Sequence, residues 1–480
     1  MAEIKTDQFP QASLRAIADP GLQAALERAG GGFNTARLEA IDEMGSARWE
    51  EMREQAREIK RHTLDNLDYY LDLLTDRITR NGGSVHFARD AKEANSVVTE
   101  LALSRGVKLA TKSKSMVSEE IGLNDALAEV GVEAVETDLG EYIIQLAEET
   151  PFHIVAPAMH KTRRQVSDLF SDKIGTPSME AIEDMTEAAR NALRSRFLQA
   201  DMGITGANFL VAETGTLVIV TNEGNGRFCT SAPPVHVAIT GMEKVIPTLE
   251  DLALFLRLLP RSATGQRLTS YVSMVSGPRR PEDPDGPEEF HLVVVDNGRS
   301  RLLADPELRE ALYCIRCGAC LNICPVYRKV GGHAYGWVYP GPIGAVVSPV
   351  LVGLPQARDL PNASSLCGAC RDVCPIKINI PHMLLALRNR LAESESPEER
   401  HTNLFERLSA WGYGALMSSP RLLSAVRGLG RVLQTPLVKA GMIRKAPFPP
   451  LSKWTRQRDL PPLAPKAFRK IWEEDLSRGP

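Results

Sequence analysis

CIRCGACLNICP spans Cys314 to Pro325, and LCGACRDVCP spans Leu366 to Pro375. These two runs contain seven of the eight cysteines in a chain of 480 residues. A disulfide framework needs cysteines spread through a short secreted chain, whereas C-x2-C-x2-C-x3-C-P directs several thiolates to one point, as iron-sulfur ligation requires. The sequence therefore predicts a fold built around two iron-sulfur clusters.

In two-cluster ferredoxin motifs, the cysteine before the proline ligates the other cluster. The first cluster is then expected on four cysteines, which are Cys314, Cys317, Cys320 and Cys374. The cysteines left for the second cluster are Cys324, Cys367 and Cys370. Ser364 stands where the second run would have its first cysteine. The two sites are unequal, and the first, with four thiolates, is the expected electron relay.

One missing cysteine leaves three forms of the second cluster open. It is a 3Fe-4S cluster, a 4Fe-4S cluster closed by Ser364 or another protein oxygen, or a 4Fe-4S cluster with one iron open to a ligand. We expect 4Fe-4S with a weak or exogenous fourth ligand. Zinc also binds C-x2-C pairs, but it needs only four ligands per site and does not require the C-x3-C-P endings. The eighth cysteine, Cys229, is expected to be a small buried hydrophobe rather than a ligand.

The composition is that of an ordinary soluble protein, with 43% hydrophobic and 24% charged residues. The formal charge of -3 gives no general attraction to nucleic acid, so we expect no nucleic-acid partner. Glu3, Lys5 and Asp7 interrupt the apolar core that a signal peptide would need, and no apolar stretch is long enough to span a bilayer. Because the clustered thiolates must stay reduced, we expect a cytoplasmic location.

Local patterns divide the chain into four parts. Residues 1–83 read as a helical arm, with helices at 36–44, 49–59 and 64–78 and glycine breaks at 30–32 and 81–83. Residues 84–301 alternate β-type and helical runs, which favours an α/β domain with a mainly parallel sheet. Its expected strands lie at 107–110, 132–136, 153–156, 216–220, 235–239 and 292–295, and Thr176-Pro177 is expected to begin a helix.

Residues 302–395 are expected to form an α-helical ferredoxin domain, which a helix starting at Asp305-Pro306 opens. Residues 396–480 read as a helical, proline-rich C-terminal region. This region is locally basic, with Arg421, Arg427, Arg431, Lys439, Arg444 and Lys445. A basic amphipathic stretch can make a peripheral contact with a membrane or a partner, and it can equally be a helical cover over the cluster domain.

Two polar stretches of the α/β domain follow expected strands, where open α/β sheets place ligands. The first, Thr111 to Ser115, offers Lys112 and Lys114 to an anion, although such a loop is also an ordinary capped helix start. The second runs from Glu213 to Arg227 and could hold an anion on backbone amides, with Arg227 as a clamp, or be a plain hairpin turn. No G-x-G-x-x-G or P-loop motif is present, so the chain reads as one subunit of an oxidoreductase.

Several stretches resemble a known family. KSKSMVSEEIGLN (112–124) and AETGTLVIVTNEGNGR (212–227) are similar to the LUD, or lactate-utilisation, domain. DGPEEFHLVVVDNGRS (285–300), the cysteine runs and WTRQRDLPP (454–462) resemble the iron-sulfur subunits of the LutB/LldF family, whose second run also has three cysteines. The resemblance implies an α/β domain of the isomerase and CoA-transferase type, followed by an α-helical ferredoxin module.

The resemblance also implies a bacterial system that oxidises L-lactate to pyruvate. The expected partners are a LutA-like cysteine-rich subunit, a LutC-like LUD subunit and an electron acceptor that the sequence does not identify. In this hypothesis two electrons leave L-lactate and pass singly through the two clusters. Two alternatives stay open: CoA-transferase or isomerase chemistry with Glu213 as nucleophile beside structural clusters, and a scaffold subunit.

Overall fold

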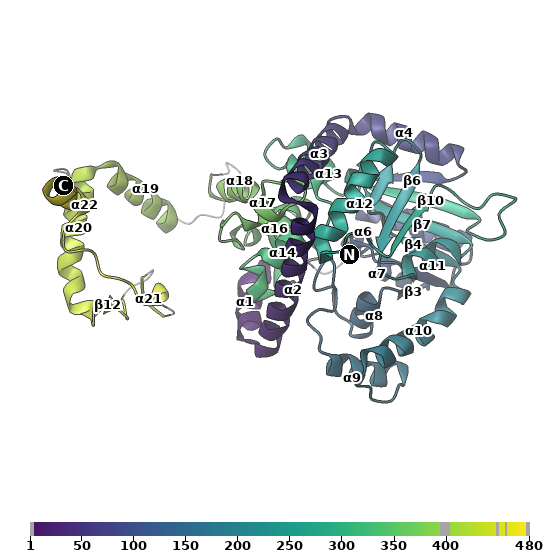
Figure 1. Cartoon of the computed structure of the whole chain (residues 1–480), viewed down its shortest axis with the longest axis horizontal. Helices are drawn as coiled ribbons and strands as arrows, with labels where there is room; N and C mark the ends of the chain where they lie inside the picture. The colour runs from purple at the N-terminus through teal and green to yellow at the C-terminus, as the bar shows by residue number, and fades with distance from the viewer. Residues whose placement is uncertain (1–3, 394–403, 448–450, 457, 477–480) are drawn as a thin grey trace. The chain divides into compact units, whose positions relative to one another are not determined.

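In the computed structural model, a parallel sheet of six strands forms the centre of the α/β domain (Figure 1). Its order is β1 (Ser84–Ala88), β10 (Glu289–Val295), β7 (Val235–Gly241), β4 (Met202–Thr205), β2 (Leu109–Lys112) and β3 (Glu133–Glu136). The inner strands are buried on both faces, as parallel sheets require. The expected mainly parallel sheet is confirmed.

Helices cover both faces of this sheet. One face carries α5 (Ala91–Ser104), α6 (Met116–Ile121) and α7 (Leu123–Glu129), whose apolar side chains share a core with the strands. A separate core near β2 and β3 contains α8 (Leu139–Leu146), α9 (Arg163–Ile174) and α10 (Ile182–Gln199). The short helix α11 (Asn225–Ser231) packs against β4.

A second, mixed sheet lies beside the first. Its order is β8 (Val245–Ile246), β5 (Phe209–Val211), β6 (Thr216–Thr221) and β9 (Tyr271–Val275), and α12 (Leu249–Thr264) contacts β5. The expected strand at 216–220 belongs here and pairs antiparallel with both neighbours. A run of apolar residues predicts a strand but does not identify the strands that pair with it, so this second sheet was not predicted.

Two local predictions were wrong. Residues 153–156 form an irregular turn instead of a strand, because Nδ1 of His153 accepts hydrogen bonds from the backbone amides of Val155 and Ala156. The helix expected at Thr176 begins only at Ile182, because α9 ends with Gly175 in the left-handed conformation and a loop follows.

The N-terminal arm packs between the α/β domain and the cysteine module, which we define as residues 302–393 (Figure 1). The arm consists of α1 (Phe9–Ala18), α2 (Pro20–Met44), α3 (Ser46–Asp65) and α4 (Leu67–Arg80). The expected break at 30–32 was wrong, because α2 runs through Gly30, Gly31 and Gly32 without interruption. α2 contacts α12 on one side and the cysteine module on the other.

The cysteine module consists of short helices around two loops. They are α13 (Arg299–Ala304), a 3-10 turn at Arg309–Tyr313, α14 (Ala319–Ile323), α15 (Tyr327–Val330), α16 (Gly341–Leu351), α17 (Ala369–Val373) and α18 (Ile380–Glu393). The longer helix expected from Asp305 is only this 3-10 turn. One hydrophobic core runs through the arm, the second sheet and the cysteine module.

The structure describes residues 4–393, 404–447, 451–456 and 458–476, which divide into two compact units at residue 400. The second unit contains α19 (Leu404–Ser418), α20 (Pro420–Gln434), a hairpin of β11 (Val438–Lys439) and β12 (Met442–Ile443), α21 (Leu451–Trp454) and α22 (Phe468–Ile471). The predicted boundary at 395/396 and parts of the proline-rich stretch lie outside the described residues. No helix within these ranges is both long and apolar enough to cross a membrane.

Candidate functional site

The two cysteine runs fold as a repeated unit. Arg316 and Leu366 adopt positive φ angles of 60° and 55°, and Gly318 and Gly368 follow in the left-handed region at 75° and 86°. Each turn leads into a short helix, α14 or α17, and the two helices pack against each other. The repeated turn bends each run back on itself, so that its cysteines meet those of the other run.

Four thiols from both runs line one small cavity. Its cysteines are Cys314, Cys317, Cys320 and Cys374. The remaining lining is mainly apolar and includes Ile154, Ile343 and Ile376. The structure therefore brings together, from two distant stretches, the four cysteines expected at the first cluster.

The other three cysteines form a second group closer to the surface. Burial, together with the nearby charges of Cys324 and Cys367, raises the pKa of Cys370 to about 12. Cys324 and Cys370 are buried, whereas Cys367 is exposed. In the first group Cys317, Cys320 and Cys374 are buried and Cys314 is half-buried, so Cys367 is the thiol most open to solvent.

Ser364 repeats the local geometry of Cys314. The Oγ of Ser364 accepts a hydrogen bond from the backbone amide of Leu366 at 3.1 Å, and the Sγ of Cys314 accepts one from the amide of Arg316 at 3.4 Å. Arg388 also donates to the carbonyl of Ser364 at 2.9 Å, which fixes this turn. The hydroxyl therefore holds the place in the second run that a thiol holds in the first.

The cysteines fit iron-sulfur clusters. All eight are free thiols, so no disulfide competes for them. Burial raises the pKa of Cys374 to about 11 and raises that of Cys317 as well, with a further contribution from each neighbouring thiolate. Thiols that converge in such an apolar place ionise only if a metal supplies positive charge. Iron-sulfur ligation requires ionised thiols, so the irons would supply that charge.

The N-terminal arm stabilises the end of α17. Arg53 donates to the carbonyl of Cys374 through Nε at 3.0 Å and through Nη2 at 2.8 Å, and Nη2 also reaches the carbonyl of Asp372 at 2.9 Å. Arg37 donates to the carbonyl of Val373 at 3.1 Å. Two guanidinium groups therefore satisfy the last carbonyls of this helix, where positive charge is favourable.

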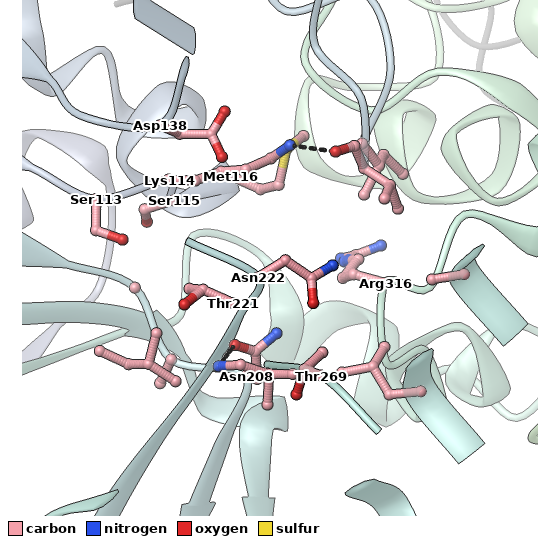
Figure 2. Close-up of a pocket in the computed structure, with 18 of the residues that line it drawn as sticks. Ser113, Lys114, Ser115, Met116, Asp138, Asn208, Thr221, Asn222, Thr269 and Arg316 are labelled. Carbon is pink, nitrogen blue, oxygen red and sulfur yellow. Dashed lines mark hydrogen bonds between the residues drawn. The ribbon is translucent and has the colours of Figure 1, made fainter. Parts of the chain in front are cut away.

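A larger cavity of about 300 Å³ lies between the α/β domain and the first cysteine run (Figure 2). Residues that follow the carboxyl ends of β2, β3, β4 and β7 line it, among them Ser113, Asp138, Asn208 and Lys244. Open α/β sheets bind ligands at this edge. Arg316 and Tyr339 of the cysteine module line its other side, so the cavity lies next to the first thiol group.

One end of the cavity is cationic. Arg316 stacks over the ring of Tyr339 at 4.5 Å, and its Nη2 lies 3.8 Å from Oε1 of Glu243. Lys244 is 8% exposed, and burial lowers the pKa of its ammonium group to about 8, with Glu243 opposing the shift and Arg316 adding to it. Arg316 and Lys244 therefore lie close enough to repel each other in a poorly solvated place.

The other end of the cavity holds two carboxyl groups. Asp138 caps α8 by accepting a hydrogen bond from the amide of Glu141 at 3.2 Å, and burial raises the pKa of Glu223, with the charge of Asp138 adding to the shift. Lys114 donates to the carbonyl of Val155 at 3.1 Å across the cavity (Figure 2). Figure 2 shows Asp138 and Arg316 on opposite sides and Lys114 beside Asp138, so one end of the cavity is basic and the other holds two carboxyl groups and one ammonium group.

Both polar stretches that the sequence singled out contribute to the cavity, the first through Ser113 to Ser115 and the second through Thr221 to Glu223 and Asn225, but three of the four named candidate side chains lie away from it. Lys112 is buried and pairs with Glu119 at 2.6 Å and Glu136 at 2.7 Å, so it serves an internal ion cluster. Glu213 accepts a hydrogen bond from the first amide of α12 at 3.2 Å, and Arg227 lies in α11 rather than in the expected turn. Of the four candidates, only Lys114 lines the cavity.

Sequence reasoning missed the residues at the cationic end. Arg316 lies between Cys314 and Cys317, inside a motif defined by its cysteines. Lys244 follows β7 in a short 3-10 turn that no motif marks. A basic residue inside a C-x2-C pair was the one available signal. Cys229, as expected, is fully buried, and its Sγ lies 3.5 Å from the hydroxyl of Thr137.

Two histidines and a glutamate meet at one further point. One ligand atom from each of Glu149, His160 and His333 lies within 4.8 Å of the others. Lys161 already pairs with Glu149, and Nε2 of His333 donates to the carbonyl of Thr150 at 2.7 Å. Glu149 and His333 thus already have partners, whereas Nδ1 of His160 is buried without one among the described residues.

Comparison with known proteins agrees with this architecture. A family model described as the LUD domain matches residues 71–295, and one described as a 4Fe-4S dicluster domain matches residues 310–378. Lactate utilization protein B of Shouchella clausii is 46% identical over 478 residues and covers 99% of both chains. The protein of the same name from Bacillus licheniformis is 44% identical over 474 residues and covers 98% of both.

Among solved structures, a DUF162 family protein from Deinococcus radiodurans matches 48% of this chain and 98% of its own, with 13% identity and a TM-score of 0.27. This score is too low to support an argument about the fold.

Proposed function

Because this chain belongs to the lactate utilization protein B family, we propose that it is the iron-sulfur electron-transfer subunit of a complex that oxidises L-lactate to pyruvate. The observation that supports this role most strongly is the arrangement of the thiols. One group of four, three of them buried, lies beside the large cavity, and a group of three reaches the surface through Cys367. Two centres placed in this way suit a path from an internal site to an external acceptor.

The proposed ligands follow from this grouping. Cys314, Cys317, Cys320 and Cys374 hold the first cluster, and Cys324, Cys367 and Cys370 hold the second. Ser364 is the proposed fourth ligand of the second cluster, because its hydroxyl repeats the place of Cys314. When bound, iron-sulfur clusters accept and release one electron at a time, so a pair suits a substrate that gives up two.

The chain itself supplies insulation and charge. The apolar lining keeps water from the first thiol group, while Arg316 and Lys244 place positive charge next to it. Oxidation of L-lactate releases two electrons and two protons, and the electrons pass to an acceptor outside this chain. We propose a cytoplasmic complex with a LutA-like cysteine-rich subunit and a LutC-like LUD subunit, in which the exposed second group faces the acceptor.

The proposal is tested on the assembled complex by rapid mixing with L-lactate in the absence of oxygen. We expect the visible absorption of the oxidised clusters to bleach at least as fast as the complex turns over, and to return when an acceptor dye is added. Cys370→Ser should weaken the second cluster and slow transfer to the dye. Turnover with both clusters fully oxidised throughout would rule out the electron-transfer role.

The same experiment addresses the transferase alternative. Glu213 lies outside the cavity and caps α12, so Glu213→Gln should leave lactate oxidation within about twofold of the parent complex. Loss of activity in this variant, with no change in the visible absorption of the clusters when L-lactate is added, would favour a nucleophilic carboxylate instead.

A further inference from the structure

We propose that the 300 Å³ cavity binds a short 2-hydroxy or 2-oxo carboxylate, with the carboxylate group held between Arg316 and Lys244 beside the first thiol group. The choice of this acid class rests on the proposed function, whereas the anion site rests on the geometry alone. The site would place the substrate next to the first cluster and leave the second cluster to face the acceptor.

The charges around the basic end are unbalanced. Arg299 is fully engaged, because it binds Glu120 in a bidentate pair at 2.8 and 2.9 Å and reaches Glu243 at 2.7 Å. Three further cations, the buried Lys60 and Lys244 and the largely buried Arg316, lie near Glu243 but not Glu120, and burial lowers the pKa of Lys60 to about 7 and that of Lys244 to about 8. Buried charges need partners, so this excess of positive charge favours a bound anion.

Polar atoms that line the cavity lack partners. The Nη1 of Arg316 and the Oγ1 of Thr240 are buried, and neither has a hydrogen-bond partner among the described residues. The ammonium group of Lys244 likewise forms no hydrogen bond or close ion pair within the part of the chain that the structure describes. A carboxylate accepts several hydrogen bonds at once, and Arg binds it in a forked geometry.

The opposite end of the cavity limits what the ligand can be. Asp138 and Glu223 outnumber the one cation at this end, Lys114, so they would repel a second anionic group, and they can accept a hydrogen bond from a hydroxyl. Asn208 and Asn222 enter between the two ends (Figure 2). A monocarboxylate with one further polar group therefore fits better than a dicarboxylate or an inorganic phosphate.

The competing explanation is that these cations serve the cluster only. Iron-sulfur clusters with four thiolates carry net negative charge, and nearby cations raise their potential. That role requires Arg316 and Lys244 but not the hydroxyl of Thr240, which lines the cavity. Thr240 therefore distinguishes a ligand site from simple charge compensation.

The test is calorimetric titration of the cluster-loaded full chain with L-lactate and with pyruvate, under conditions in which no electrons are transferred. We expect Lys244→Met to weaken binding about 10-fold to 100-fold, because it removes a charge-assisted contact, and Thr240→Val to weaken it about 3-fold to 10-fold. Lys108→Met, an exposed lysine on the same domain, is the matched control and should bind as the parent does. Iron content and visible absorption must match the parent in each variant.

Succinate and inorganic phosphate should bind at least 10-fold more weakly than L-lactate. Equal binding of L-lactate by the parent, Lys244→Met and Thr240→Val would overturn the site, and so would tight binding of succinate. Binding without any bleaching in the assembled complex would instead contradict the proposed electron-transfer role and leave the site intact. If the clusters bleach but Lys244→Met and Thr240→Val bind L-lactate as tightly as the parent, the electron-transfer role stands and the proposed site is wrong.

Discussion

At the scale of single residues, the side chains at the first ligand position of the two cysteine runs differ by one atom, a sulfur in Cys314 and an oxygen in Ser364. Cys314 and Ser364 occupy the same place in the repeat, and each accepts a hydrogen bond from the amide two residues further along. A serine oxygen is a harder and more basic ligand than a thiolate, and it binds iron only when it is deprotonated. The second cluster should therefore lose iron from this corner more readily than the first.

Ser364→Cys tests this difference. Treatment of the parent with ferricyanide should produce the EPR signal of an oxidised 3Fe-4S cluster at close to one spin per chain, whereas Ser364→Cys should give less than about a fifth of it, because four thiolates hold the cluster. The neighbouring exposed Ser365 supplies the control, and Ser365→Cys should behave as the parent does. An unchanged signal in Ser364→Cys would mean that the hydroxyl is not a ligand.

At the scale of elements, the α2 helix shows how packing overrides local preference. Three consecutive glycines predict a break, but Asp19 caps the helix by accepting from the amides of Gly21 at 2.9 Å and Leu22 at 3.1 Å, and both flanks of α2 are packed. Gly30 lies 3.4 to 3.5 Å, measured from a built Cβ, from Arg328 and the carbonyl of Asn322. Contacts with two domains thus stabilise a helix that its own residues would not form.

The glycines of this molecule should respond differently to alanine. At Gly32 a Cβ would meet nothing within 4 Å, so Gly32→Ala should raise the free energy of unfolding by about 0.5–1 kcal/mol by restricting the unfolded chain. In β4, a Cβ on Gly203 would lie 1.8 Å from the carbonyl of Cys229, and Gly203→Ala should lower the free energy by about 1–3 kcal/mol. Urea unfolding measures both, and a destabilising Gly32→Ala would contradict the helical environment described for α2.

At the scale of the whole molecule, the arm, the sheets and the cysteine module share one core. The N-terminal arm helps to position Cys374, because Arg37 and Arg53 donate hydrogen bonds to the carbonyls of Val373 and Cys374 at the end of α17. The fourth cysteine of the first group thus depends on a helix that lies more than half the chain away in sequence. Stability of the first cluster is therefore a property of the assembled unit.

Arg53→Met should loosen this attachment. We expect the variant to lose iron to a chelator about 10-fold faster than the parent, because its hydrogen bonds to Cys374 and Asp372 are charge-assisted. On the same helix, Arg61 pairs only with Glu58 and Asp65 among the described residues, so Arg61→Met should lose iron at the parental rate. Equal rates for both variants would show that the arm does not support the cluster.

The sequence by itself determined the chemistry of the cysteines, because the spacing within each run constrains which thiols can reach one metal centre. It also determined the α/β domain, since buried parallel strands leave continuous apolar runs that can be read locally. Only the tertiary structure decided which side chains meet in the cavity. Lys114, Lys244, Asn208 and Arg316 come from four separate stretches, and no local pattern records their convergence.

The same dependence on long-range contacts explains why Lys112, Glu213 and Arg227 do not line the cavity. Lys112 and Lys114 are two residues apart and would share a face of a continuous strand. However, β2 ends at Lys112, which enters a buried ion cluster, whereas Lys114 lies in the following loop and lines the cavity. Glu213 precedes β6 and caps α12, whereas the cavity lies at the other end of β6, and Arg227 lies in α11 just beyond the lining residue Asn225. Sheet membership depends on long-range pairing, which the residues of one strand do not specify.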